Sequence, residues 1–233
     1  MKNKKKYRHV FFDLDETLWD FKRNSLEVIH ELINNYQLEE RGIKRDFFVS
    51  RYHHHNDHFW DLFRKGQISR EELRIVRWKT TLGEFEIHDE NFARLLSEQY
   101  LQLLPAKKHL HDSTIEILNY LKPKYSLHII TNGFEEVQLQ KIMASGIASY
   151  FTHIITSERA GSQKPNKEIF RYAFEIANAT VAESIFIGDS IEADIMGAKA
   201  VAMDHILFNP ERLPHYEAVQ LEITSLTELR TIL

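Results

Sequence analysis

The sequence predicts an α/β protein, in which an open parallel β-sheet is covered by helices on both faces and interrupted by an all-helical insert. Short apolar runs rich in strand-forming residues recur along the chain, and most of them are followed by a stretch with helical spacing. A segment of about 85 residues after the first run contains no convincing strand. With 8 Gly and 5 Pro in 233 residues, turn formers are scarce, which favours long regular elements.

Five apolar runs are predicted as strands. They are Tyr7–Leu14, Tyr125–Thr131, His153–Thr156, Ser184–Gly188 and Met203–Leu207. Helical spacing follows three of them, at Glu135–Ser145, Asn166–Asn178 and Ile191–Val201, and Leu226–Leu233 is expected to form a closing helix. Strand followed by helix, repeated, implies right-handed βαβ units and a parallel sheet.

The stretch from Phe21 to Leu104 is different in character and is expected to be wholly helical. Helices are predicted near residues 24–38, 45–64, 69–82 and 89–103. Ser69 followed by Glu72 is the pattern of a capping box, and Pro105 marks the return to the sheet. The predicted domains are therefore a core of residues 1–20 and 106–233 and a helical insertion of residues 21–105.

Composition excludes several classes of protein. The absence of cysteine rules out disulfides, thiolate metal sites and cysteine nucleophiles. Five of the 30 Lys and Arg residues lie within the first eight positions, which leaves 25 against 34 acidic residues in the body. Such an acidic body argues against binding a nucleic-acid polymer. Since no secretory signal or membrane-length apolar segment is present, we expect a cytoplasmic protein with no membrane contact.

Four polar clusters follow predicted strands. The first is Asp13-Leu14-Asp15, directly after an apolar run, and the second is Thr131-Asn132-Gly133, which ends another. Lys164-Pro165-Asn166 precedes a well-patterned helix, and Asp189 ends a strand five residues before Asp194. Each cluster alone is explained by a turn, a helix cap or a surface residue. Together they place carboxylates, a hydroxyl and a lysine at the ligand-binding edge of a parallel sheet.

In this order, the DxD, TN, K and GDxxxxD clusters resemble the four motifs of the haloacid dehalogenase-like superfamily of phosphohydrolases. The resemblance touches the whole core and implies a Rossmann-like sheet. The insert looks like the family's helical cap, placed between the first and second motifs. About 30 residues separate Gly133 from Lys164, too few for the alternative cap of other branches.

The resemblance also implies a mechanism. Asp13 is expected to attack phosphorus and form an aspartyl-phosphate, and Asp15 to protonate the leaving oxygen and then activate water. Thr131, with the amides near Asn132, is expected to bind the phosphoryl oxygens, while Lys164 screens the anionic nucleophile. Mg²⁺ is the expected cofactor. Its implied ligands are the carboxylates of Asp13 and Asp189 and the backbone carbonyl of Asp15, and Asp194, or less favourably Glu192, is expected to orient Lys164 or metal-bound water.

Asp15 favours a phosphatase over a dehalogenase, because the dehalogenase branch lacks an acid at this position. The mutase branch shares these residues and is less firmly excluded. The phosphonate-cleaving branch needs a lysine in its cap, and both candidates, Lys65 and Lys79, are interpreted as surface residues. A binding module of the same fold would be expected to have lost Asp13, Asp15 or Asp189.

The substrate is expected to be a small phosphate ester recognised by the helical insertion. Stretches around Asp15, Thr131, Lys164 and Trp60 look most like pyrimidine 5′-nucleotidases, so a pyrimidine nucleoside 5′-monophosphate is favoured. A sugar phosphate, phosphoglycolate or an acylneuraminate phosphate is the alternative. One of Trp19, Phe21 or Trp60 is hypothesised to contact the nucleoside. The protein is expected to be a monomer or weak homo-oligomer.

The run His53-His54-His55, with His58 one turn beyond His54, allows a second metal site. The chain holds 13 histidines, and no carboxylate pattern accompanies this run, so a solvated or partly packed helix face is the favoured interpretation.

Overall fold

The computed structural model describes residues 7–233, so the basic residues before Tyr7 lie outside it. The chain forms two compact units. Of the described residues, the core unit comprises 7–21 together with Lys108–Leu233, and the helical unit comprises Lys22–Lys107.

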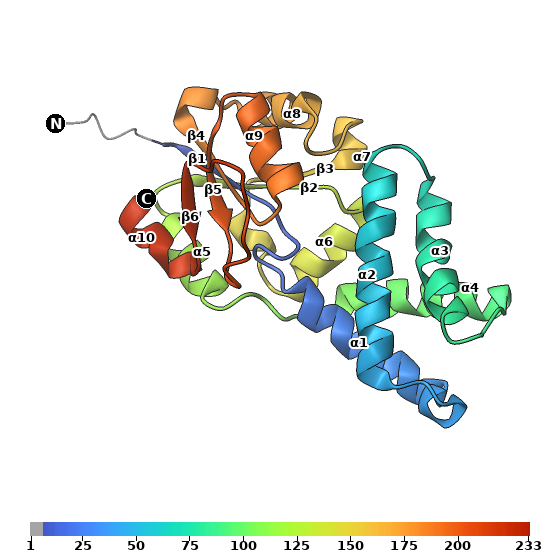
Figure 1. Ribbon diagram of the computed structural model, residues 1–233. Helices are drawn as coiled ribbons and strands as arrows, with labels where there is room; N and C mark the ends of the chain where they lie inside the picture. Colours follow the sequence, from blue (N-terminus) through green and yellow to red (C-terminus); the bar gives the residue numbers. More distant parts are fainter. Residues whose placement is uncertain (1–6) are drawn as a thin grey trace. The chain divides into compact units, whose positions relative to one another are not determined.

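The core unit is built on a parallel sheet of six strands in the order β3-β2-β1-β4-β5-β6 (Figure 1). The strands are β1 (His9–Phe12), β2 (Ser126–Thr131), β3 (His153–Thr156), β4 (Ser184–Gly188), β5 (Asp204–Phe208) and β6 (Leu221–Ile223). The α/β prediction and the first five strands are confirmed. The sixth strand was not predicted, because it has only three residues and buries only Ile223.

Strand order places the site-bearing loops next to one another. β1 pairs with β2 on one side and β4 on the other, and Phe12 lies between Ile129 and Ile187 in the register. The chain therefore leaves the two strands that flank β1 at the same edge, where the strand order reverses. In open α/β sheets this reversal point is where ligands bind.

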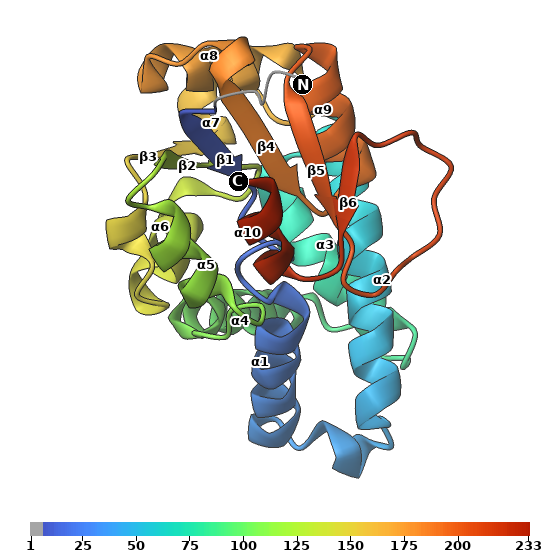
Figure 2. The ribbon, with the colours of Figure 1, turned by 90° about the vertical axis from the view of Figure 1, so that its left-hand side faces the viewer.

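Helices cover both faces of the sheet. They are α5 (Thr114–Leu121), α6 (Glu135–Ala144), α7 (Ser157–Ala160), α8 (Lys167–Ala177), α9 (Met196–Ala200) and α10 (Leu229–Ile232). Figures 1 and 2 show α8 and α9 on one face and α5, α6 and α10 on the other. On the first face, Phe11, Ile130 and Phe186 of the sheet pack with Phe170 of α8 and Ala198 of α9. Burial of these apolar side chains is the main force holding the layers together.

Two predicted helices have a different form. A π-helical turn, η5 (Ile191–Ile195), precedes α9, and the amide of Ile195 donates to the carbonyl of Ser190, five residues back. The closing segment begins as the 3₁₀ turn η6 (Leu226–Glu228) before α10, with Ser225 as its cap. Helical spacing alone does not distinguish these tighter and wider turns from an α-helix.

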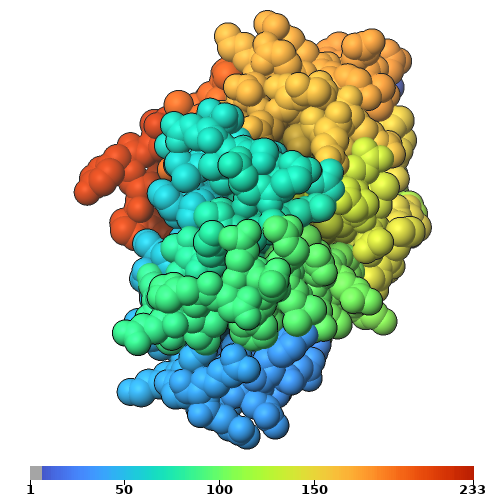
Figure 3. All heavy atoms as spheres, turned by 90° about the vertical axis from the view of Figure 1, so that its right-hand side faces the viewer, coloured from blue at the N-terminus to red at the C-terminus, as the bar shows by residue number. Residues whose placement is uncertain are grey.

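The helical unit contains four α-helices and two 3₁₀ turns among its described residues. They are α1 (Phe21–Asn35, whose first residue belongs to the core unit), η1 (Leu38–Arg41), α2 (Arg45–Arg64), α3 (Arg70–Gly83), α4 (Glu90–Leu103) and η2 (Leu104–Ala106). α3 packs against α2 and α4, and Figure 3 shows the surface of the unit from blue near residue 25 to green near residue 100. The predicted capping box is present. The Ser69 hydroxyl accepts from the backbone amide of Glu72, and the Glu72 carboxylate accepts from the backbone amide of Ser69.

The histidines of α2 make contacts inside the helical unit. His53 Nε2 lies 3.0 Å from Ser25 Oγ, and His55 Nε2 lies 2.8 Å from a carboxylate oxygen of Glu84. Among the residues that the structure describes, no metal-binding group of side chains includes these histidines. These contacts fit a partly packed helix face.

Lys65 and Lys79 of the helical unit each form a surface ion pair. They pair with Asp61 and Glu90 respectively, and both lysine side chains are 59% exposed. This agrees with their interpretation as surface residues. Over residues 7–233, no helix is long and apolar enough to cross a membrane.

Candidate active site

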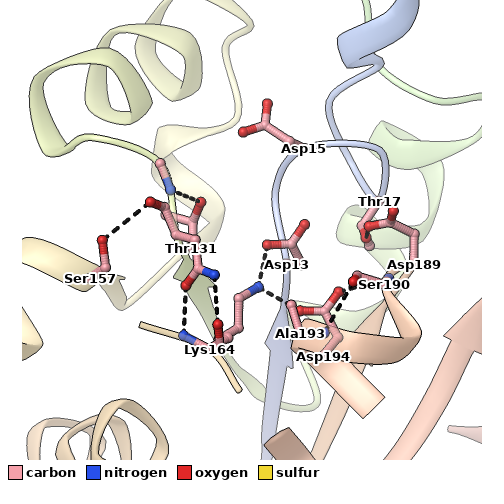
Figure 4. Close-up of polar contacts among 12 residues, drawn as sticks. Asp13, Asp15, Thr17, Thr131, Ser157, Lys164, Asp189, Ser190, Ala193 and Asp194 are labelled. Carbon is pink, nitrogen blue, oxygen red and sulfur yellow. Dashed lines mark hydrogen bonds and ion pairs between the residues drawn. The ribbon is translucent and has the colours of Figure 1, made fainter. Parts of the chain in front are cut away.

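A buried lysine lies between two carboxylates at the carboxyl edge of the sheet. The ammonium of Lys164 lies 2.5 Å from Asp13, which directly follows β1, and 2.6 Å from Asp194 of η5 (Figure 4). The Lys164 side chain is 2% exposed. A charge this deeply buried needs groups that compensate it, and here two carboxylates do so, so Lys164, Asp13 and Asp194 form one electrostatic unit.

Asp189 adds a third carboxylate to this unit. It follows β4 directly, accepts a hydrogen bond of 3.0 Å from the Thr17 hydroxyl, and has a carboxylate oxygen within 4.8 Å of oxygens of Asp13 and Asp194. Burial raises the pKa of Asp189 well above its usual range, and the Asp194 and Asp13 carboxylates raise it further. Negative charge is therefore in excess here.

Asp13 and Lys164 respond to this crowding in different ways. Burial raises the pKa of Asp13 to about 7, although the neighbouring Lys164 ammonium opposes the shift. Burial lowers the pKa of Lys164, but the attraction of Asp13 and Asp194 outweighs that effect, and the net direction is upward. Lys164 is thus held as a cation, and the excess of carboxylates over cations makes ionisation of Asp13 costly.

The loop after β2 fixes the backbone of Lys164. The Asn132 side chain accepts from the Lys164 amide at 2.7 Å and donates to the Lys164 carbonyl at 2.9 Å. The Lys164–Pro165 bond that follows is cis. Both polar atoms of the Asn132 side chain are therefore used to hold the lysine segment, so the predicted substrate contact of Asn132 rests on its backbone amide.

The turn after β4 is shaped by Gly188. A Cβ atom at this position would lie 2.3 Å from Asp194 Oδ2, much closer than such atoms ever approach. The same oxygen accepts from the Ser190 amide at 3.1 Å. Glycine is therefore required for Asp194 to reach Lys164.

Asp15 lies apart from the Lys164 cluster and contacts α6 instead. Figure 4 shows its side chain pointing away from Asp13. One carboxylate oxygen accepts from Lys141 at 2.6 Å and the other from the amide nitrogen of Gln138 at 2.8 Å. Gln138 also lies 2.6 Å from the hydroxyl of Thr131, which is buried at the end of β2.

The structure thus brings Asp13, Lys164, Asp189 and Asp194 together, and connects Asp15 to Thr131 through Gln138. The sequence pattern did not point to Thr17, Gln138 or Lys141 as site residues. Thr17 stands within four residues of Asp13, and this proximity is a usable signal. Gln138 and Lys141 occupy one side of a helix rich in polar residues, a pattern typical of a solvated face, and nothing in that pattern points to the site.

Comparison with known proteins identifies the family. Residues 7–202 match the haloacid dehalogenase-like hydrolase family. The chain belongs to this family of hydrolases. The expectation that it is an enzyme is confirmed at that level.

Three relatives illustrate the range of this hydrolase's family. The HAD-hydrolase YfnB of Bacillus subtilis is 30% identical, with 98% of this chain and 96% of YfnB covered. Its crystal structure, bound to magnesium, superposes with a TM-score of 0.89 and covers 98% of this chain and 99% of that one. Pyrimidine 5′-nucleotidase PynA of Streptococcus pneumoniae is 28% identical (92% and 89% covered). Human N-acylneuraminate-9-phosphatase is also 28% identical (82% and 77% covered).

The donor set of this hydrolase suits a hard divalent cation. Asp13, Asp189 and Asp194 supply carboxylate oxygens from three segments, and one lysine does not balance their charge. Mg²⁺ prefers oxygen ligands and keeps several waters, so it needs few protein groups. Burial, and after it the neighbouring carboxylates, raise the pKa values of Asp13 and Asp189, and a divalent ion near the two would favour their ionised forms.

Proposed function

We propose that this hydrolase is a Mg²⁺-dependent phosphatase that cleaves a small phosphate monoester through an aspartyl-phosphate on Asp13. The observation that carries the proposal is the buried Lys164 ammonium between Asp13 and Asp194, with Asp189 alongside. Attack by a carboxylate on a phosphate dianion brings like charges together. The site must therefore supply positive charge and still leave one oxygen of the Asp13 carboxylate free to attack.

Asp13 is the proposed nucleophile. Lys164 is 2.5 Å from Oδ1 of Asp13, which leaves Oδ2 to attack phosphorus. The lysine fixes the rotamer of the carboxylate and offsets its charge when the phosphate approaches. Asp194, which accepts from Lys164 and from the Ser190 amide, holds the ammonium in that place.

Asp15 is the proposed general acid and base. In the first step it gives its proton to the leaving oxygen, and in the second it removes a proton from the water that attacks the aspartyl-phosphate. Thr131, the Asn132 backbone amide and the Lys164 ammonium are proposed to bind the phosphoryl oxygens.

Mg²⁺ is the proposed cofactor. The carboxylates of Asp13 and Asp189 and the backbone carbonyl of Asp15 would hold it, and its charge would lower the cost of bringing a phosphate dianion to Asp13. The acidic crowding around Asp13 and Asp189 supports this assignment, as does the magnesium-bound structure of the similar YfnB.

The substrate proposed is a pyrimidine nucleoside 5′-monophosphate. Residues 1–20 and 106–233 would supply the catalytic motifs and residues 21–105 the specificity, because the motifs can grip only the phosphoryl group. The similarity to PynA supports a nucleotide, and the equal identity of N-acylneuraminate-9-phosphatase favours a sugar phosphate as the second candidate. The Trp19 ring is buried with the Lys141 ammonium 4.4 Å from its centre, which favours Phe21 or Trp60 for a base contact.

Phosphate release tests the proposal directly. The purified protein is assayed with Mg²⁺ and with EDTA on dUMP, UMP, dTMP, acylneuraminate 9-phosphate, sugar phosphates and phosphoglycolate, with Asp13→Asn as the blank. We expect selective release from the pyrimidine nucleotides that disappears in EDTA and in Asp13→Asn.

Each other outcome changes a specific part of the proposal. Preference for another ester would leave the mechanism and replace the substrate. Isomerisation of a sugar phosphate without release of phosphate would indicate a phosphomutase. No Mg²⁺-dependent turnover of any ester would overturn the proposal in favour of a binding module.

A further inference from the structure

We propose that Gln138 and Lys141 of α6 are positioning residues that hold Asp15 for proton transfer to the leaving oxygen. This inference rests on the proposed phosphatase function and adds to it two residues from outside the four polar clusters. The two side chains lie three residues apart on one side of α6, and each donates to a different oxygen of the same carboxylate.

Lys141 is placed for this purpose by burial and by an aromatic face. Its side chain is 4% exposed, its ammonium is 2.6 Å from Asp15 Oδ1, and it lies 4.4 Å from the centre of the Trp19 ring. Trp19 is fully buried. A lysine at the surface would change rotamer freely, whereas a lysine confined between a carboxylate and a buried indole has one position.

Gln138 connects Asp15 to the hydroxyl of Thr131. Its amide nitrogen donates hydrogen bonds to Asp15 Oδ2 at 2.8 Å and to Thr131 Oγ1 at 2.6 Å, and the side chain is fully buried. The amide must face this way, because the reverse orientation would set its carbonyl oxygen against the carboxylate.

The contacts of Thr131 determine where its proton points. Oγ1 accepts from Gln138 and also from the Gly133 amide at 3.2 Å. A hydroxyl that accepts twice has its own proton left to donate, and a phosphoryl oxygen is an acceptor. Gln138 therefore orients both the Asp15 carboxyl, the proposed acid, and the Thr131 hydroxyl, which is proposed to bind a phosphoryl oxygen.

Gly133 makes room for this arrangement. A Cβ atom on Gly133 would lie 2.4 Å from the amide carbon of Gln138. The Thr131-Asn132-Gly133 turn and Gln138 are thus fitted to each other, which a solvated glutamine on a helix surface would not need.

The inference predicts which esters depend on the two residues. In the first step the bond from phosphorus to the leaving oxygen breaks, the bond to Asp13 forms, and a proton passes from protonated Asp15 to the leaving oxygen. Lys141 and Gln138 then stabilise the Asp15 carboxylate that this transfer leaves. A poor leaving group needs that proton and a good one leaves as an anion. Misplacing Asp15 should therefore slow phenyl phosphate much more than 4-nitrophenyl phosphate, although the two esters are nearly the same shape.

The experiment measures kcat/KM for both esters with Mg²⁺ in the wild type, Lys141→Met, Lys141→Arg, Gln138→Met and Asp15→Asn. Lys122→Met is the matched control, because Lys122 also lies over an aromatic ring, that of Tyr150, but belongs to the opposite edge of the sheet, just before β2. Thermal unfolding checks that each variant folds. If Lys141→Met does not fold, Gln138→Met carries the same comparison.

We expect Lys141→Met and Gln138→Met to lose about 100-fold on phenyl phosphate and less than about 10-fold on 4-nitrophenyl phosphate. Lys141→Arg should restore the wild-type ratio between the esters to within about threefold, since it keeps a donor. Adding Lys141→Met to Asp15→Asn should cost little more than Asp15→Asn alone, because both remove one function.

Equal losses on the two esters, or none, in folded variants would overturn the inference while the phosphatase function stands. A wild-type protein inactive on both esters and on the wider substrate panel would overturn the proposed function and this inference with it.

Discussion

Two buried cationic side chains, one chosen from each unit, are accommodated in different ways. Lys164 in the core unit, 2% exposed, is paired with two carboxylates. Arg77 in the helical unit, 4% exposed, donates to the side-chain oxygen of Asn56 at 2.8 Å and lies over the rings of Tyr52 and Tyr100. Among the residues that the structure describes, no carboxylate forms an ion pair with Arg77.

The difference teaches how to recognise a reactive cluster. Around Arg77 a neutral amide and two aromatic faces stabilise the charge, and the buried atoms left without a hydrogen-bond partner among the described residues, Arg77 Nε and the Tyr52 hydroxyl, bring no excess of negative charge. Around Lys164 two carboxylates pair with one ammonium and a third, Asp189, lies close to both, so negative charge exceeds positive charge in a buried place. An arrangement that only stabilised the fold would balance its charges, and the imbalance is what a cation or a reacting phosphate can use.

The largest expected effect is on enzymatic activity, which should depend on Lys164 and not on Arg77. Lys164→Met should reduce phosphate release by at least about 10³-fold, because it removes the charge that positions Asp13 and leaves the carboxylates without a partner. Arg77→Met should leave kcat for 4-nitrophenyl phosphate within about threefold, because its contacts lie inside the helical unit. Steady-state assays of both folded variants measure this, and comparable losses in the two would break the comparison.

A pair of glycines sharpens the distinction between the site and the packed core. Gly188→Ala forces its Cβ onto Asp194, so activity should fall about 100-fold as Asp194 leaves Lys164. Gly197→Ala forces its Cβ to 2.4 Å from the Phe170 ring, which overpacks α9 against α8 and should cost about 1–3 kcal/mol of stability while activity per folded molecule is retained. Assays and urea unfolding of both variants provide the check, and an active Gly188→Ala enzyme would contradict the role given to Asp194.

Sequence periodicity was enough for the sheet and for the edge where the site lies. Buried parallel strands are short apolar runs, and their carboxyl ends must meet at one edge, so the four clusters that follow β1, β2, β3 and β4 were predicted to converge. Asp13, Lys164, Asp189 and Asp194 do converge. Helix α5 was missed because its apolar stretch has only eight residues and lacks a side-chain cap.

The contacts of α6 could not be predicted in the same way. Glu135–Ala144 carries polar residues at most positions, and which of them face inward depends on how the helix docks on the sheet. That docking is tertiary information, and it decides that Gln138 and Lys141 are buried at Asp15. The same holds for Asn132, whose side chain holds a segment more than 30 residues away.

The next prediction tests the structural role of Arg77 by stability. Arg77→Met should lower the free energy of unfolding by about 2 kcal/mol, because Asn56 loses its buried donor and the two tyrosine rings lose their cation. Arg94→Met is the matched control on α4: its side chain is 51% exposed and reaches Glu90 only at 3.7 Å, so its removal should change stability by less than about 0.5 kcal/mol. Urea denaturation distinguishes them, and equal effects would mean that Arg77 is not part of the packing.

The last prediction concerns His128, a buried base that the core unit keeps uncharged. His128 lies on β2, stacked between His153 and Phe11, with its Nε2 3.1 Å from Nδ1 of His9. Burial, together with the smaller effect of the neighbouring His9 and His153, lowers its pKa to about 3. In the unfolded chain its pKa is about 6.5, so below that pH the unfolded state binds a proton that the folded state does not.

Stability linked to His128 is therefore fully present above pH 6.5 and is lost as the pH falls toward 3. Between pH 7.5 and 5.0 this group should account for about 2 kcal/mol of lost unfolding free energy. His128→Phe keeps an aromatic ring in the stack but cannot bind a proton. Between pH 7.5 and 5.0 the variant should therefore lose about 2 kcal/mol less unfolding free energy than the wild type. Urea denaturation at the two pH values measures both losses, and parallel losses would show that His128 takes up a proton in the folded protein. In that case the core unit, like the helical unit, would hold a buried cation stacked on aromatic rings without a carboxylate partner among the described residues, and the contrast would lie between two kinds of cluster and no longer between the two units.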